Sequence, residues 1–166
     1  RGGPDQFQTN NPRLLVRDAR RRAARVAAGR PEHPTKVTLT ATGDLDPGSA
    51  FFTAGDGPKL VYVPSPAIAD RVPGAATVVV AAALDALLAD LAGRGVGRLL
   101  VGGGTAVHTA FLSTGLADEL SLAIAPILVG GGTRFVDPAG FPAGRLRLLG
   151  VEAVDDMAVL SYGRPA

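Results

Sequence analysis

The pattern of apolar, polar and glycine residues along the chain predicts three helices. The clearest spans residues 81–92, where four leucines recur at i, i+3, i+4 and i+7 and so lie on one helix face. An Arg- and Ala-rich stretch at 18–28 is compatible with a helix and is closed by Gly29. A shorter helix is predicted at about 106–114, where Gly115 ends it.

Stretches rich in β-branched and apolar residues predict the strands. The run at 98–101 is short and apolar, as expected of a strand whose two faces are both covered. Asp155 and Asp156 supply a turn, so the last two strands form an antiparallel hairpin. The predicted strands are 36–42, 59–63, 76–80, 98–101, 119–129, 146–154 and 157–163.

The order of these elements predicts the fold class. The middle of the chain runs strand, strand, helix, strand, helix, strand, and the end is a hairpin. Strands that alternate with helices are typical of a parallel sheet covered by helices. We therefore predict an α/β fold with a mostly parallel sheet flanked by helices and a carboxy-terminal antiparallel hairpin. Residues 1–166 are expected to form a single domain, with a polar loop at 1–12.

Composition narrows the class of protein. The chain has 166 residues, of which 46% are hydrophobic, enough for the core of one ordinary domain. No apolar run reaches the ~18 residues that a membrane span needs, and the polar start has no cleavable signal pattern. The absence of cysteine excludes disulfides, thiolate metal sites and cysteine nucleophiles. With two histidines and no metal-ligand spacing, we expect a cytoplasmic protein without a metal site or a membrane contact.

The candidate chemistry lies where the strand at 98–101 meets the following helix. Gly102, Gly103 and Gly104 join the two elements. Glycines let backbone N–H groups approach a ligand closely, and the first turn of a helix adds free N–H donors and the positive end of the helix dipole. A phosphate suits such a turn, and Thr105 would either cap the helix or donate its hydroxyl to the same anion. The alternative is a tight turn with a threonine cap and no ligand.

Two common phosphate motifs do not fit this turn. The dinucleotide fingerprint GxGxxG requires a glycine where Val107 stands. No GK[ST] sequence follows, so the turn is not a P-loop. A different nucleotide-binding fold is therefore required.

Three stretches together resemble the reductase domain of riboflavin biosynthesis, a relative of dihydrofolate reductase. They are NNPRLLVR at 10–17, KVTLTATGDLDP at 36–47 and LLVGGGTAVHTAFLSTGLADELSLAIAPILVGGG at 99–132. The family pattern runs from a strand through an acid-Gly-Gly turn and a helix to Gly-Leu-x-Asp-Glu-Leu and an Ala-Pro strand. Residues 115–120 and 125–126 match the last two parts closely, and the similarity covers nearly all of residues 10–163.

The resemblance implies a dihydrofolate-reductase-like fold, usually in a homodimer, and an NADPH-dependent reductase. The family's reaction reduces the ribosyl group of a diaminopyrimidinone 5′-phosphate to the ribityl form, with hydride from the nicotinamide. No catalytic residue is carried over. The substrate contacts implied by position are Leu14, Arg17 and Gly102, and Arg17 suits the substrate phosphate. The implied cofactor contacts are Asn10, Ala41, Gly103, Gly104, Thr105, Ala106, Val107 and His108.

Two departures of the chain from the family pattern bear most on its activity. The acidic residue that opens the family's glycine turn, a substrate contact, is Gly102 here. The family's usual amino-terminal strands do not precede residue 10, so we expect either an incomplete chain or a degenerate paralogue. The alternative to a reductase is therefore a nucleotide-binding or dimerisation protein of this family that has lost catalysis.

Arginines and histidines elsewhere admit a structural and a functional interpretation. Arg20 to Arg22 with Arg25 predict a solvated helix face rather than a site for nucleic acid or the NADPH 2′-phosphate, because no aromatic platform accompanies them. His108 is interpreted as a partly exposed helix residue or a phosphate contact, and His33, between two prolines, as part of a surface loop. Gly130 to Gly132 predict a flexible loop rather than a second phosphate site, since no clear helix follows.

Overall fold

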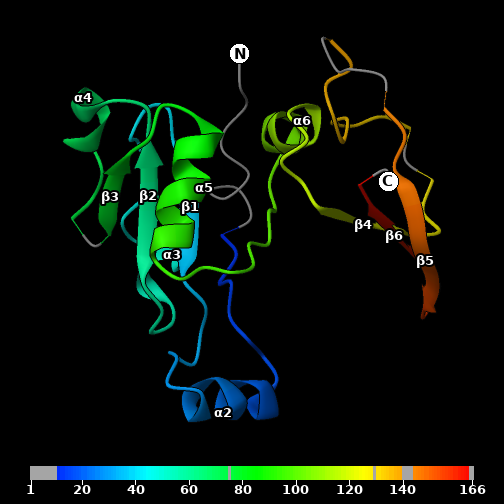
Figure 1. The fold of residues 1–166 in the computed structure, drawn as a ribbon, viewed down its shortest axis with the longest axis horizontal. Coiled ribbons are helices and arrows are strands. Elements are labelled where there is room, and N and C mark those ends of the chain that lie inside the picture. The colour runs from blue at the N-terminus through cyan, green and yellow to red at the C-terminus, as the bar shows by residue number, and fades with distance from the viewer. Residues whose placement is uncertain (1–10, 75, 129, 140–143, 165–166) are drawn as a thin grey trace. The chain divides into compact units, whose positions relative to one another are not determined.

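The computed structural model describes residues 11–74, 76–128, 130–139 and 144–164. The chain divides into two compact units, Arg1–Leu99 and Leu100–Ala166. Figure 1 shows a parallel sheet in the first unit and an antiparallel sheet in the second. The predicted α/β class, with a parallel sheet, helices and a carboxy-terminal antiparallel hairpin, is confirmed.

A three-stranded parallel sheet forms the centre of the first unit. Strand β2 (Lys59–Val63) lies between β1 (Lys36–Leu39) and β3 (Thr77–Val80) and pairs with both in parallel. The short helices α3 (Ala50–Thr53) and α4 (Pro66–Ala69) stand in the connections between the strands. The carboxyl ends of all three strands therefore meet at one edge of the sheet.

Strand β2 is buried on both faces of this sheet. On one face its two interior-facing valines pack against the two phenylalanines of α3. On the other face Leu60 and Tyr62 pack against helix α5 (Leu84–Gly93) through Leu87 and Leu91, which belong to the predicted apolar helix face. Burial on both sides explains why the sequence of β2 is apolar at nearly every position.

Helix α2 (Ala19–Ala27) contributes none of its residues to the core. Asp18 is its N-cap, and the carboxylate accepts a hydrogen bond from Arg21 N–H at 2.8 Å. Gly29 follows the helix in the left-handed conformation, with φ at +69°. The predicted helix at 18–28 is therefore confirmed to within one residue at each end.

The second unit contains helix α6 (Thr105–Ser113) and a three-stranded antiparallel sheet. Strand β6 (Met157–Gly163) lies between β4 (Glu119–Ile124) and β5 (Arg147–Val154). Within the described part of this unit, Phe111 of α6 is the only large apolar side chain that is buried. None of the helices in the described ranges has the length and apolarity of a membrane span.

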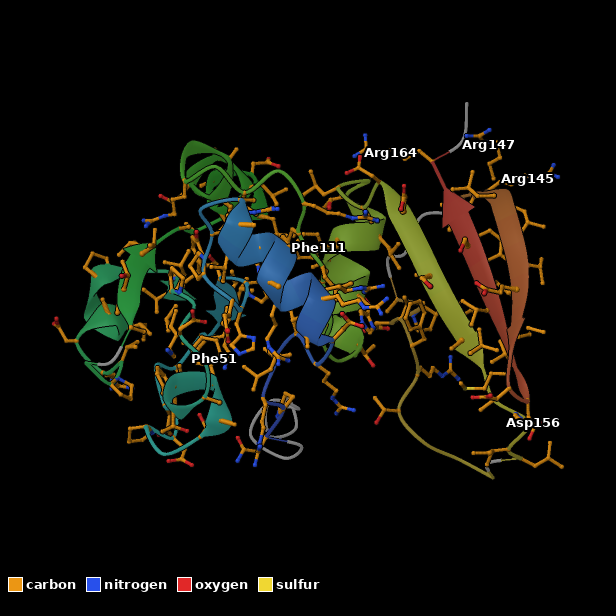
Figure 2. The ribbon with its side chains drawn as sticks, turned by 90° about the horizontal axis from the view of Figure 1, so that it is seen from below. Phe51, Phe111, Arg145, Arg147, Asp156 and Arg164 are labelled. Atoms are coloured by element: carbon orange, nitrogen blue, oxygen red, sulfur yellow. The ribbon has the colours of Figure 1, made fainter. Side chains whose placement is uncertain are left out.

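The carboxy-terminal hairpin agrees closely with the prediction. Residues 155–156 form the turn between β5 and β6, and Asp155 has φ at +52°. Figure 2 shows Asp156 at the turn end of this sheet and Arg147 and Arg164 at the opposite end. Arg164 forms an ion pair with Asp118, the residue before β4, at 3.0 Å.

The prediction of a strand at 98–101 is wrong. These residues have no regular secondary structure, and Leu100 is 95% exposed. An apolar run becomes a strand only where a neighbouring strand supplies hydrogen-bond partners, and none of the described strands pairs with this run. The strand predicted at 119–129 also ends early, at Ile124, because Pro126 has no N–H group for a sheet.

Candidate functional site

The amino-terminal end of α6 carries the predicted phosphate turn. Gly104 is the N-cap, and because it has no side chain the helix has no side-chain cap. The first intrahelical hydrogen bonds run from the N–H groups of Val107 and His108 to the Gly104 carbonyl, both at 3.1 Å. The N–H groups of Thr105 and Ala106 precede these bonds and point out of the helix end. With the positive end of the helix dipole, this end of α6 suits an anion.

Thr105 does not cap α6, so one of its two predicted roles is wrong. It is the first helical residue, one position after the N-cap. A capping side chain must precede the helix to reach the N–H groups two or three residues further on. The Thr105 hydroxyl instead donates a hydrogen bond to the carbonyl of Arg134. Thr105 therefore joins α6 to the irregular loop that follows β4.

Two further contacts hold this loop, residues 133–137, against α6. Asp137 N–H donates a hydrogen bond to the hydroxyl of Thr109 at 2.8 Å. The rings of His108 and Phe135 lie 4.6 Å apart and are tilted by 34°. His108 is thus a half-buried side chain packed on an aromatic ring, beside the candidate phosphate turn.

A hollow of about 270 Å³ lies at the carboxyl ends of the three parallel strands. Crevices at this edge are the usual ligand sites of open α/β sheets. Its volume is just below the range of about 300–1,000 Å³ typical of whole drug-sized ligands, so it suits one ring system of a larger ligand. Ala41, two residues after β1, lies in its wall. The wall is formed by Leu39, Thr40, Ala41, Tyr62, Val63, Pro64, Ala81, Ala82, Ala83, Leu84 and Leu87.

A hydrogen-bonded network stands behind the wall of this hollow. The hydroxyl of Tyr62 donates to the carboxylate of Asp90 at 2.6 Å, and Arg94 donates two N–H bonds to that carboxylate at 2.7 and 3.2 Å. Burial raises the pKa of Tyr62 to about 12, and the hydrogen bond to Asp90 acts in the same direction. The hydrogen bond from Arg94 lowers the pKa of the Asp90 carboxyl. The i,i+4 spacing of Asp90 and Arg94 was the sequence signal available for this network.

The segment before α2 carries the predicted substrate contacts Leu14 and Arg17. Residues 11–18 have no regular secondary structure. The side-chain oxygen of Asn11 accepts a hydrogen bond from Ala50 N–H at 2.6 Å. Leu14 has φ at +51°, a left-handed conformation that is uncommon for a bulky side chain. Strain of this kind concentrates in functional segments, where the surrounding contacts maintain it.

His33 is largely buried, so its interpretation as part of a surface loop is wrong for the side chain. The side chain is 13% exposed, and Nδ1 accepts a hydrogen bond from Val16 N–H at 3.2 Å. The imidazole and the side chain of Leu15 close over Gly55. A Cβ atom there would lie 2.7 Å from Leu15 Cδ2 and 3.1 Å from His33 Cδ2. These partners are distant in the sequence, so two flanking prolines alone do not reveal the burial.

The family model of the RibD C-terminal domain matches residues 2–160. The chain belongs to the RibD C-terminal domain family. No curated protein sequence matches the chain closely enough to serve as a relative.

Solved structures similar to this RibD C-terminal domain share its fold. A pyrimidine reductase-like protein from Corynebacterium diphtheriae is 18% identical with a TM-score of 0.78, and the match covers 96% of this chain and 73% of that one. RibD of Acinetobacter baumannii is 22% identical with a TM-score of 0.73, over 96% of this chain and 45% of its own. The third is a diaminohydroxyphosphoribosylaminopyrimidine deaminase/5-amino-6-(5-phosphoribosylamino)uracil reductase from Thermotoga maritima. It is 19% identical with a TM-score of 0.75, over 96% of this chain and 43% of its own.

These likenesses confirm the expected dihydrofolate-reductase-like fold. The chain spans about three quarters of the Corynebacterium protein and less than half of the other two.

The predicted site residues of this RibD C-terminal domain lie in both units. Leu14, Arg17 and Ala41 belong to the first unit, and Gly102 to His108 are contiguous in the second. Asn10 lies outside the described residues. Within the described ranges, no group of three or more acidic or histidine side chains is placed to hold a metal ion.

Proposed function

We propose that this RibD C-terminal domain is an NADPH-dependent reductase that converts the ribosyl group of a phosphorylated aminopyrimidine to the ribityl form. The observation that carries the proposal is the family match over residues 2–160. The Thermotoga neighbour is by its name a 5-amino-6-(5-phosphoribosylamino)uracil reductase, which supplies the substrate class. Residues 1–166 act as one reductase domain in a cytoplasmic homodimer.

The chain offers groups that fit a dinucleotide. The uncapped end of α6 presents N–H donors beside Gly103 and Gly104, which suits a pyrophosphate. The apolar hollow at the strand ends, with Ala41 in its wall, suits a ring. Asn10, Val107 and His108 complete the proposed cofactor contacts. When bound, the reduced nicotinamide supplies the hydride.

The proposed substrate contacts come from the segment before α2 in the first unit and from the glycine turn in the second. Arg17 is exposed and carries a planar guanidinium, the group that binds a phosphate through paired hydrogen bonds. Leu14 contributes an apolar surface from its left-handed position. Gly102 is the third proposed substrate contact, and nothing lies within 4 Å of its Cβ position, so the backbone there is open to a ligand.

The glycine at position 102 favours one alternative function. Members of the family carry an acidic substrate contact at this place, and the chain has none. The absence of this acid fits a nucleotide-binding or dimerisation protein of the family that has lost catalysis.

An assay of cofactor oxidation tests the proposal. The chain is mixed with NADPH and 5-amino-6-(5-phosphoribosylamino)uracil, and the loss of reduced-nicotinamide absorbance is followed. We expect turnover, and in Arg17→Gln a KM for the pyrimidine raised about 10- to 100-fold, the range for a lost hydrogen bond to a charged group. Arg20→Gln, on the exposed side of α2, is the matched control. NADPH binding without turnover supports the nucleotide-binding alternative, whereas no NADPH binding by the folded chain contradicts the reductase and leaves a dimerisation protein.

A further inference from the structure

The backbone next to Arg17 is held from two sides. Val16 N–H donates to Nδ1 of His33 at 3.2 Å. From α2, Arg22 Nη1 donates to the carbonyls of Val16 and Arg17 at 3.2 and 2.7 Å. The exposed guanidinium of Arg17 therefore projects from a backbone whose polar groups are bound on both sides.

The loop that carries His33 is itself fixed. The N–H groups of Glu32 and His33 donate to the carboxylate of Asp56 at 3.0 and 3.1 Å. Arg25 of α2 donates its Nε–H to the carbonyls of Pro31 and Glu32 at 2.9 and 3.0 Å. The basic run of α2 is thus only partly a solvated face. Arg22 binds the backbone that carries Val16, and Arg25 binds the backbone just before His33.

The contact between Val16 and His33 depends on one protonation state. An imidazole nitrogen accepts a hydrogen bond only when it carries no proton, so His33 must be neutral with its proton on Nε2. Protonation would place an N–H at Nδ1, facing the N–H of Val16.

Charged groups of both signs lie around His33. The carboxylate of Glu32 lies 4.0 Å from Nε2 and is shared with Arg22 at 3.9 Å, and Asp56 binds the adjacent N–H groups. Lys59 donates to the carbonyl of Gly55, the residue under the imidazole. The neutral ring with its proton on Nε2 fits both neighbours, since Nδ1 accepts from Val16 and Nε2–H lies on the side of the Glu32 carboxylate. The hydrogen bond to Val16 is therefore specific to this one state of His33.

We infer that His33 is a positioning residue for substrate. Its neutral imidazole holds Val16, and with it Leu14 and Arg17, in the geometry that receives the substrate phosphate, and protonation releases this segment. The inference rests on the proposed function, because the roles of Leu14 and Arg17 belong to it. The left-handed φ of Leu14 fits the inference, since such a conformation persists only where neighbouring contacts impose it.

The hydrogen bond between Val16 and His33 is tested first, in an experiment that needs no enzymatic turnover. Nuclear magnetic resonance of the whole chain between pH 8 and pH 5 reports the ring nitrogens of His33 and the exchange of the Val16 amide. We expect the Nε2–H tautomer at pH 8 and a Val16 amide whose protection is lost as His33 is protonated. An Nδ1–H tautomer at pH 8, or a Val16 amide indifferent to the titration of His33, would overturn the inference.

The positioning role is tested by KM and kcat as functions of pH in two variants. His33→Asn keeps an oxygen acceptor near the place of Nδ1 and does not titrate, whereas His33→Leu has no acceptor. From pH 7.5 to pH 5.5 the wild-type KM for the pyrimidine phosphate should rise about 3- to 10-fold more than that of His33→Asn, with kcat nearly unchanged. His33→Leu should have the raised KM at both pH values. The substrate phosphate itself titrates near pH 6, which changes KM in both proteins alike. The comparison with His33→Asn removes this contribution.

The outcomes separate this inference from the function on which it rests. Turnover with the same pH dependence of KM in wild type and His33→Asn overturns the positioning role and leaves the reductase intact. Absence of wild-type turnover refutes the proposed function, and the positioning role falls with it even if the resonance experiment finds the Val16 contact.

Discussion

The hydroxyl of Tyr62 links the buried face of β2 to an ion pair on α5. The ring is 2% exposed and forms part of the wall of the hollow, while the hydroxyl donates to Asp90. Because burial and the Asp90 carboxylate both disfavour a phenolate, the pKa of Tyr62 rises to about 12 from the usual 10. Tyr62 therefore forms part of the wall of the hollow and also makes the stability of the fold depend on pH.

The pH dependence of stability that Tyr62 contributes gives a testable prediction. A group whose pKa is raised in the folded state contributes stability that is present below pH 10 and is lost as pH rises through about 12. Tyr62→Phe should lower the free energy of unfolding by about 1–3 kcal/mol at pH 8, since Asp90 loses a donor. In urea unfolding, the difference in the free energy of unfolding between the wild type and Tyr62→Phe should be smaller at pH 11 than at pH 8. Tyr162→Phe, which removes the other tyrosine of the chain, is the control and should keep the wild-type pH dependence.

At the scale of the element, the turn after β1 adjoins the wall of the hollow. Gly43 has φ at +74°, and its N–H donates to the hydroxyl of Thr40, which lies in the wall. A Cβ atom on Gly43 would lie 2.8 Å from both Arg71 Cβ and the Ile68 carbonyl oxygen. Only glycine satisfies both the backbone angle and this close approach.

Two alanine substitutions separate these two requirements. Gly29 has a similar φ of +69°, but nothing lies within 4 Å of its Cβ position. Gly29→Ala should lower the free energy of unfolding by about 1 kcal/mol, the cost of the backbone angle alone. Gly43→Ala should lower it by roughly 2–4 kcal/mol, because a steric clash is added. If denaturant unfolding shows the same loss of unfolding free energy in both variants, the close approach at Gly43 adds no cost.

The elements also show where sequence patterns succeed. The strands at 59–63 and 157–163 were predicted with their observed bounds, because alternation and flanking turn residues are local signals. The prediction of a strand at 98–101 failed because a strand needs a neighbouring strand to pair with, and the residues of the run alone do not show whether one is present. The Val16–His33 contact spans 17 positions and the Tyr62–Asp90 contact spans 28. The i,i+4 spacing signals only the Asp90–Arg94 pair, and no periodicity encodes the two long-range contacts. The sequence therefore located the glycine turn but neither of these contacts.

At the scale of the whole molecule, one face of the β4–β6–β5 sheet is apolar across all three strands. The register aligns Leu122, Leu160 and Val151, and Leu120, Tyr162 and Leu148 form the next row. Val151 and Leu148 are 64% and 54% exposed. An exposed apolar surface of this extent is typical of an interface between proteins. The proposed homodimer would cover it.

A charge on this face tests the proposed homodimer. Val151→Lys should convert the dimer to a monomer in sedimentation experiments at micromolar concentration, because an interface cannot bury an unpaired ammonium. Val26→Lys introduces the same charge on α2, where the side chain is 54% exposed, and should leave the dimer intact. A wild-type chain that sediments as a monomer, or a Val151→Lys variant that remains dimeric, would contradict the assignment of this face.

The most direct test of the account is calorimetric titration of NADPH and NADH into the chain and into Gly104→Asp. Aspartate is a favoured N-cap, so its carboxylate would occupy the N–H groups at the end of α6 while leaving the helix at least as stable. Gly97→Asp, at an open glycine position in the first unit, carries the same charge change as a control.

The account predicts micromolar binding of NADPH by the wild type and by Gly97→Asp, with binding abolished in a folded Gly104→Asp. Equal NADPH binding by all three proteins, or none by the folded wild type, would contradict the glycine turn as the cofactor's phosphate site.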